Sequence, residues 1–252
     1  MRVKVTFIIF SVLLIACLRG VVHAQGITPA LQSELNLLEE NAQQIVTKFE
    51  GYLVDPASNT HGYADKEIYY VLSKAYYRKI RAQNSLDNAL KAWALSNPVT
   101  DPWWYNKIAV RVALAYDLIG DTTKGIAIAK DAILWAQDTE YESILQHAHI
   151  ALGMNELTSG QFDLALSNFN IAYYMGSEQA DMLAKGDVAT YLGLAYEYRD
   201  DYPEAIKFFE EAVDYFKRTN KKLLYSDVVY GLAKAYKETD ELDKALSLFL
   251  ET

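Results

Sequence analysis

The chain has 252 residues, of which 51% are hydrophobic and 23% are charged, and its formal net charge is −9. This composition is typical of a folded protein, and the acidic balance disfavours DNA or RNA as a partner, because phosphate backbones are bound through Lys and Arg. Cys17 is the single cysteine, so disulfides, thiol nucleophiles and cysteine metal sites are excluded downstream of it.

The first 24 residues have the pattern of a secretory signal peptide. Arg2 and Lys4 make a positive start, residues 5–18 form an apolar run, and Ala24 supplies a small residue for cleavage. We predict cleavage after Ala24. An uncleaved membrane anchor is an alternative, although the run is short for a span of about 20 residues and is followed by Arg19.

Residues 14–17, with the sequence Leu-Ile-Ala-Cys, allow a third interpretation. They resemble the lipobox of bacterial lipoproteins, and this resemblance implies lipidation of Cys17, which would become the new N-terminus. All three interpretations place residues 26–252 outside the cytoplasm. Because the leader resembles those of bacteria, we expect the periplasm or the cell envelope.

Residues 25–62 are predicted to form a capping helix and a loop. Thr28 is a good N-cap and Pro29 suits the first helical position. Apolar residues then follow helical spacing from Leu31 to Phe49. Gly51 favours the end of this helix, and the Pro and Asn residues after it indicate a loop.

A pattern of small and aromatic residues recurs every 40 residues in the stretch 63–252. In the first helix of each expected unit the small positions are Ser73, Ala113, Gly153, Gly193 and Ala233, and three residues later come Tyr76, Tyr116, Glu156, Tyr196 and Tyr236. In the second helix the small positions are Ala89, Gly125, Ala165, Ala205 and Ala245. Ser73 to Ala89 spans 16 residues where the other units have 12, which predicts a first helix longer by one turn. About five helix pairs are therefore expected, and no sheet, since no run alternates as a half-buried strand does.

The last unit is incomplete. Its second helix is expected to start near Glu241, and its apolar face would meet solvent through Leu246, Phe249 and Leu250. Solenoids need polar caps at their ends. We therefore expect the natural chain to continue beyond Thr252, with a frayed end or a dimer contact as the alternatives.

The fourth unit carries a family resemblance. It reads Leu-Gly-Leu-Ala-Tyr at 192–196, Tyr-Pro-Glu-Ala at 202–205 and Phe-Phe-Glu-Glu-Ala at 208–212. This resembles a tetratricopeptide repeat, a helix–turn–helix unit with a usual period of about 34 residues. The longer period resembles that of periplasmic sensor and scaffold proteins of bacteria. The resemblance implies an all-α fold, a right-handed superhelical solenoid of antiparallel helix pairs.

The resemblance also implies an inner groove, lined by the first helix of each unit, that accepts a helix or an extended peptide. Its middle positions would be Val110, Leu114, Ile150, Met154, Leu194 and Glu197. Its outer positions would be Tyr70, Lys74, Tyr77, Arg78, Tyr230, Lys234 and Lys237. We expect a groove that is apolar in the middle and partly basic at both ends, with packing between units as the alternative role of Leu114 and Leu194. Chaperone-binding family members clamp a carboxylate with Lys and Asn, and that pairing is missing here.

No motif for catalysis or metal binding is found. The chain lacks the phosphate loop GxxxxGK[ST], the nucleophile motif GxSxG and the zinc motif HExxH. His147 and His149 are two residues apart, so they lie on different faces of a helix and are not a chelating pair. We expect no enzymatic activity within these residues, no metal and no cofactor.

Recognition is therefore the predicted function. The leading hypothesis is an exported scaffold that binds a peptide or protein, not nucleic acid, in its groove. The first alternative is the periplasmic sensor portion of a membrane receptor whose output domain, a diguanylate cyclase or a histidine kinase, lies beyond Thr252. The second is an envelope assembly lipoprotein held at a membrane through Cys17.

Overall fold

The computed structural model describes residues 26–38, 40–175, 182–219 and 222–251, and the expected leader with Cys17 lies outside them. Within these ranges the chain forms twelve α-helices and one short 3-10 helix, and no strand. The elements are α2 (Pro29–Leu38), α3 (Ala42–Val54), η1 (Pro56–Ser58), α4 (Asp65–Arg78), α5 (Ala82–Ala94), α6 (Pro102–Ile119), α7 (Thr122–Ala136), α8 (Glu142–Thr158), α9 (Phe162–Met175), α10 (Met182–Glu197), α11 (Tyr202–Arg218), α12 (Lys222–Glu238) and α13 (Leu242–Glu251).

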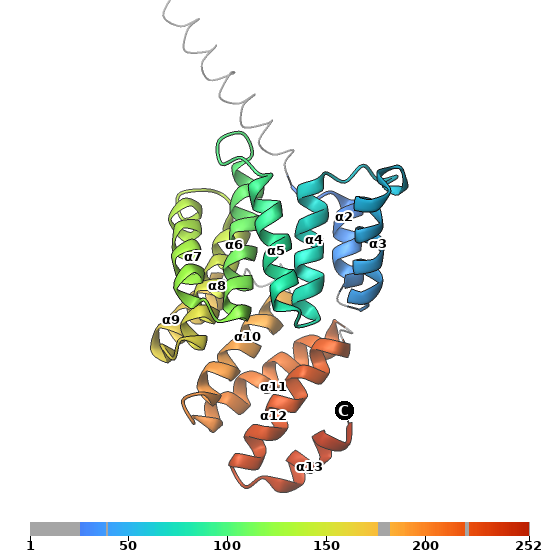
Figure 1. The fold of residues 1–252 in the computed structure, drawn as a ribbon. Helices are drawn as coiled ribbons and strands as arrows, with labels where there is room; N and C mark the ends of the chain where they lie inside the picture. The colour runs from blue at the N-terminus through green and yellow to red at the C-terminus, as the bar shows by residue number, and fades with distance from the viewer. Residues whose placement is uncertain (1–25, 39, 176–181, 220–221, 252) are drawn as a thin grey trace, which may run out of the picture.

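The helices stack in chain order as antiparallel pairs (Figure 1). Helices α2 to α9 stand side by side in the upper part of the view, and α10 to α13 turn away below them. The first helices of successive pairs also touch, so α4 contacts α6, α6 contacts α8, α8 contacts α10 and α10 contacts α12. An array in which each unit packs on its neighbours is a solenoid, as the resemblance implied.

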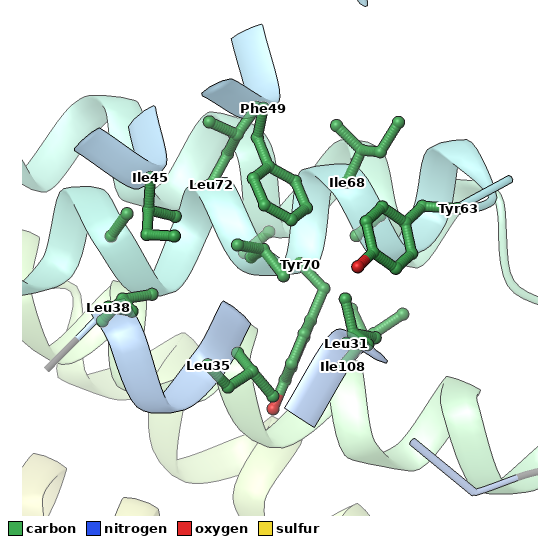
Figure 2. Packing of buried hydrophobic residues seen from close by; sticks show 14 of the residues in the cluster. Leu31, Leu35, Leu38, Ile45, Phe49, Tyr63, Ile68, Tyr70, Leu72 and Ile108 are labelled. Atoms are coloured by element: carbon green, nitrogen blue, oxygen red, sulfur yellow. The ribbon is translucent and has the colours of Figure 1, made fainter. Parts of the chain in front are cut away.

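The core is a row of four clusters of buried side chains, each shared by adjacent helix pairs. Figure 2 shows the first cluster, in which Leu31 and Leu35 of α2, Phe49 of α3 and Ile68 of α4 lie together. Each helix pair has too little apolar area to close a core of its own, so its stability depends on the neighbouring pairs.

The predicted single capping helix is wrong, because residues 29–54 form the two helices α2 and α3. Asn41 starts the second of them, since its Oδ1 accepts a hydrogen bond from the amide of Gln44 at 3.1 Å, as N-cap residues do. Gly51 does not end this helix, which continues to Val54. The N-terminal segment is therefore a helix pair in its own right, tied across by the Lys48–Glu34 ion pair.

The turn between the two helices of each unit repeats with the same 40-residue period. The backbone φ angle is positive at Ile80 (54°), Gly120 (82°), Gly160 (78°), Asp200 (59°) and Asp240 (62°). Glycine adopts this left-handed conformation at no steric cost and Asp tolerates it, whereas a β-branched residue is strained in it. Ile80 is therefore the exception among the five turns.

The predicted small residues of both helices are buried, but in the first pair the residue that faces Ser73 is Ser85. The Ser85 hydroxyl donates a hydrogen bond to the Ser73 carbonyl oxygen at 3.0 Å, and both residues are fully buried. Ala89 lies one helical turn further along α5, at the repeat position that Phe169 occupies in α9. The expected longer first helix is also wrong, because α4 has 14 residues and α6 has 18.

Helix α13 has an exposed apolar face, as the sequence led us to expect. Among the described residues, the exposed fractions of Leu242, Leu246, Phe249 and Leu250 are 59%, 58%, 42% and 80%.

Candidate functional site

The inner side of the array encloses a cavity of about 550 Å³, which we call the deep cavity. It is lined from five successive first helices by Lys74, Tyr77 and Arg78 of α4, Arg111 and Leu114 of α6, His147 and Ile150 of α8, Asp187, Thr190, Tyr191 and Leu194 of α10, and Leu224, Asp227 and Val228 of α12, with Ile80 and Phe216 completing it. Because first helices supply most of the wall, the deep cavity is the inner groove that the family resemblance implied.

A second hollow of about 420 Å³, the side cavity, continues from the deep cavity toward the end of α10. The two share Leu194 and Asp227, and the side cavity is further lined by Glu197, Tyr198, Asp200, Tyr202, Tyr230, Gly231 and Lys234. Glu197 pairs with Lys234, and the Tyr202 hydroxyl donates a hydrogen bond to Asp200 at 3.0 Å. The side cavity is thus rich in tyrosine and acidic groups.

Two helices far apart in the sequence meet across the groove. Arg78 at the end of α4 and Asp227 of α12 form an ion pair at 3.8 Å. The curvature of the array therefore brings its first and last units to the same cavity, which a straight stack of helix pairs would not do.

The wall formed by α4 and α6 is positively charged. Burial by itself raises the pKa of the Tyr70 hydroxyl, yet the net shift is downward, because Lys107, Lys74 and Arg111 lie near it and favour the phenolate. Burial lowers the pKa of His147 to about 3, with Lys107 and Lys74 adding to the shift. His147 is therefore neutral at physiological pH.

The predicted charge pattern of the groove needs correction. Arg111 in the middle and Lys74 at one side make the α4–α6 wall basic, whereas Asp187, Asp227 and Glu197 make the α10–α12 side acidic. The sequence pattern predicted basic residues at both ends, but the Lys234 charge is offset by Glu197. The polarity runs from one wall to the other, because the superhelix folds the ends together.

Most predicted groove residues line one of the two cavities. These are Lys74, Tyr77, Arg78, Leu114, Ile150, Leu194, Glu197, Tyr230 and Lys234. Their contact with a ligand stays a prediction. Leu194 also packs against two of the core clusters, so it both lines the groove and contributes to packing between units.

Four predicted groove residues lie elsewhere. Tyr70 is 4% exposed and packs edge-on against Trp104, and it lies within the first core cluster in Figure 2. Val110 is also 4% exposed and belongs to a core cluster. Met154 packs against another core cluster, and Lys237 pairs with Glu238 at 3.6 Å. Neither of the last two lines the deep or the side cavity.

Sequence reasoning missed Arg111, although a signal for it exists. Arg111 is a lone cation in the apolar run of α6 from Ile108 to Ala115, and it lies one residue after the predicted position Val110. Helical periodicity identifies a face only to within about one residue. The prediction therefore named Val110, whereas the residue that lines the groove is its neighbour Arg111. The charge itself is the better marker of the groove.

Within the described ranges no cluster of three or more His, Cys, Asp and Glu side chains is arranged to hold a metal ion. His147 and His149 point to different elements, as predicted: His147 lines the deep cavity, and His149 donates to Asn168 of α9 at 2.8 Å. In the same part of the chain, no helix is both long and apolar enough to span a membrane.

The repeated helix pairs and the groove define a helical-repeat protein of the solenoid class. Residues 186–252 match the tetratricopeptide repeat family model, and the pairs before them follow the same 40-residue register. The C-terminal quarter of the chain is thus similar to tetratricopeptide repeats, and the solved structures described below share the fold of the whole array. No curated protein sequence matches it.

Solved structures share the fold at low sequence identity. A Rap protein complexed with competence and sporulation factor superimposes with a TM-score of 0.70 at 17% identity, over 80% of this chain and 57% of the Rap chain. Aspartyl phosphate phosphatase F from Bacillus subtilis gives 0.60 at 16%, over 80% and 52%. BtubC from P. vanneervenii gives 0.57 at 16%, over 88% and 89%. The chain thus spans little more than half of the first two proteins, and the likeness shows the fold.

Proposed function

We propose that this protein is a scaffold that binds a peptide segment of a protein partner in its inner groove, centred on the deep cavity. One observation carries the proposal: five successive first helices converge on a single cavity of about 550 Å³. Ligand sites are commonly clefts of about 300–1,000 Å³ in which apolar walls surround a few polar groups. The Rap structure, in which a protein of this fold is in complex with a factor, supports the proposal by analogy.

Ile80 supplies a second argument. Its side chain is 77% exposed, it lines the deep cavity, and its φ of 54° is unfavourable for a β-branched residue. The equivalent turns carry Gly or Asp. Backbone strain and apolar exposure at one residue oppose stability, and a contact with a bound partner accounts for both.

Replacing Ile80 by glycine is expected to stabilise the protein and weaken ligand binding. Glycine relieves the left-handed strain, for a net gain of about 1 kcal/mol, and it removes the apolar contact. Thermal melts measure the first effect. Binding of the purified protein to an array of octapeptides of varied apolar, acidic and basic content measures the second.

Val99→Gly is the matched control, because Val99 is 84% exposed and lines neither cavity. It should leave the peptide selection unchanged. If Ile80→Gly retained the wild-type peptide signals, Ile80 would not contact the ligand. If the wild-type protein bound no peptide above background, groove binding itself would be wrong.

We also propose that the protein acts outside the cytoplasm, on the basis of the leader pattern in residues 1–24. Immunoblots of fractionated cells of the source organism are expected to show a band at or just below 28.5 kDa in the envelope fraction, released without detergent. A much larger band in the membrane fraction would instead favour the receptor hypothesis. A cytoplasmic band of full mass would contradict export.

A further inference from the structure

Arg111 is a buried charge in the wall of the deep cavity. It is 6% exposed, and its Nε and Nη2 are buried without a hydrogen-bond partner. The guanidinium lies over the Tyr77 ring, 4.2 Å from the ring centroid. That contact covers a face of the planar group and leaves the Nε and Nη2 donors at its edge without acceptors.

The energetic cost of burying the Arg111 guanidinium cannot be relieved by loss of its proton. Burial lowers the pKa of both Lys107 and Arg111, but an arginine stays protonated in proteins. His147, which lines the same cavity, is neutral and therefore does not carry the cost of a buried charge. An unpaired buried charge is destabilising unless an acceptor pairs with it, so an occupant of the cavity that brings an anion is favoured.

The chain does not provide that anion within ion-pair distance. Among the described residues, none of the ion pairs found within 4 Å involves Lys74, Lys107 or Arg111, whereas many other charged side chains are paired. Asp117 attracts Arg111 from a greater distance. This is notable in a chain with 33 acidic and 24 basic residues.

The shape of the donor group favours a carboxylate. A guanidinium presents parallel N–H bonds that match the two oxygens of a carboxylate. Leu114, Ile150 and Leu194 line the same cavity, so apolar side chains of a ligand would be accommodated beside the charge.

We propose that the deep cavity recognises a carboxylate on the bound peptide, with Arg111 as its partner and Lys74 and Lys107 keeping this wall positive. The inference rests on the proposed groove binding and adds the chemistry of the ligand. The carboxylate comes either from an Asp or Glu side chain or from the C-terminus of the peptide, and apolar residues lie next to it.

The test uses the full chain on octapeptide arrays in which Asp and Glu are exchanged for Asn and Gln, each peptide being made with a free and with an amidated C-terminus. Wild type should prefer the acidic peptides about tenfold. Arg111→Gln should lose this preference, keep the preference for apolar residues, and melt no lower than wild type, since it removes an unpaired buried charge. Arg199→Gln, at an exposed ion pair with Asp163, should retain the preference.

The outcomes separate the two proposals. A preference abolished by amidation assigns the recognised group to the C-terminus, and one that survives amidation assigns it to a side chain; both support the inference. Binding of peptides by wild type without acidic preference would overturn carboxylate recognition and leave groove binding intact. An acidic preference that persists in Arg111→Gln would remove the role of Arg111. Absence of any binding by wild type would overturn both proposals.

Discussion

Gly193→Leu is expected to lower the free energy of unfolding by about 3 kcal/mol. A Cβ atom at position 193 would lie 2.6 Å from Cδ1 and Cε1 of the Phe209 ring, which is well inside van der Waals contact. The ring has no room to retreat, because Phe209 is 1% exposed and a Cβ at Gly231 would lie 3.1 Å from the ring. Urea unfolding followed by circular dichroism measures the effect.

The matched control is Gly51→Leu. Gly51 is also helical, but nothing lies within 4 Å of a Cβ added there, so the substitution should be neutral or stabilising through helix propensity. A pair of unfolding curves in which Gly193→Leu matches wild type would contradict the close approach of α10 and α11.

Gly125→Ala is expected to cost about 1–3 kcal/mol, because the added Cβ would lie 1.8 Å from Oδ1 of Asn155. The Asn155 amide is not free to swing away. It is fully buried, and its Nδ2 donates to the carbonyl oxygens of Ala113 at 3.0 Å and Ala151 at 2.8 Å. Either the helices separate or these hydrogen bonds are lost. Thermal and urea unfolding of the variant report the loss.

A double-mutant cycle tests this explanation. Asn155→Ala alone should destabilise the protein, since it leaves the Ala113 carbonyl without this donor. Combined with Gly125→Ala, it removes the clash, so the double variant should lose clearly less stability than the sum of the two single variants. Strict additivity would mean that positions 125 and 155 do not interact.

The groove shows where sequence reasoning reaches its limit. The family resemblance placed Leu114, Ile150 and Leu194 on the groove side, and all three line the deep cavity. It also placed Val110 there, whereas the neighbouring Arg111 occupies that side. A period of 3.6 residues leaves adjacent positions on α6 only about 100° apart, and an apolar residue at the boundary fits core and groove equally well.

The first unit shows a second limit. The true partner of Ser73 is Ser85, which keeps the 12-residue offset of the other four units, but a search for alanine or glycine selects Ala89. Both residues are buried on one face of α5. Only the hydrogen bond between Ser85 and Ser73 reveals which of them lies at the point of closest approach, because a buried serine behaves as a small residue once its hydroxyl is paired.

The sequence by itself determined the repeat. Small residues at 40-residue spacing mark where two helices touch, because such constraints are local and act within one helix pair. The tertiary structure alone decided the site. The Arg78–Asp227 ion pair and the unpaired Arg111 depend on how far the superhelix turns over five units. Small rotations between neighbouring pairs accumulate along the array, and no local pattern encodes their sum.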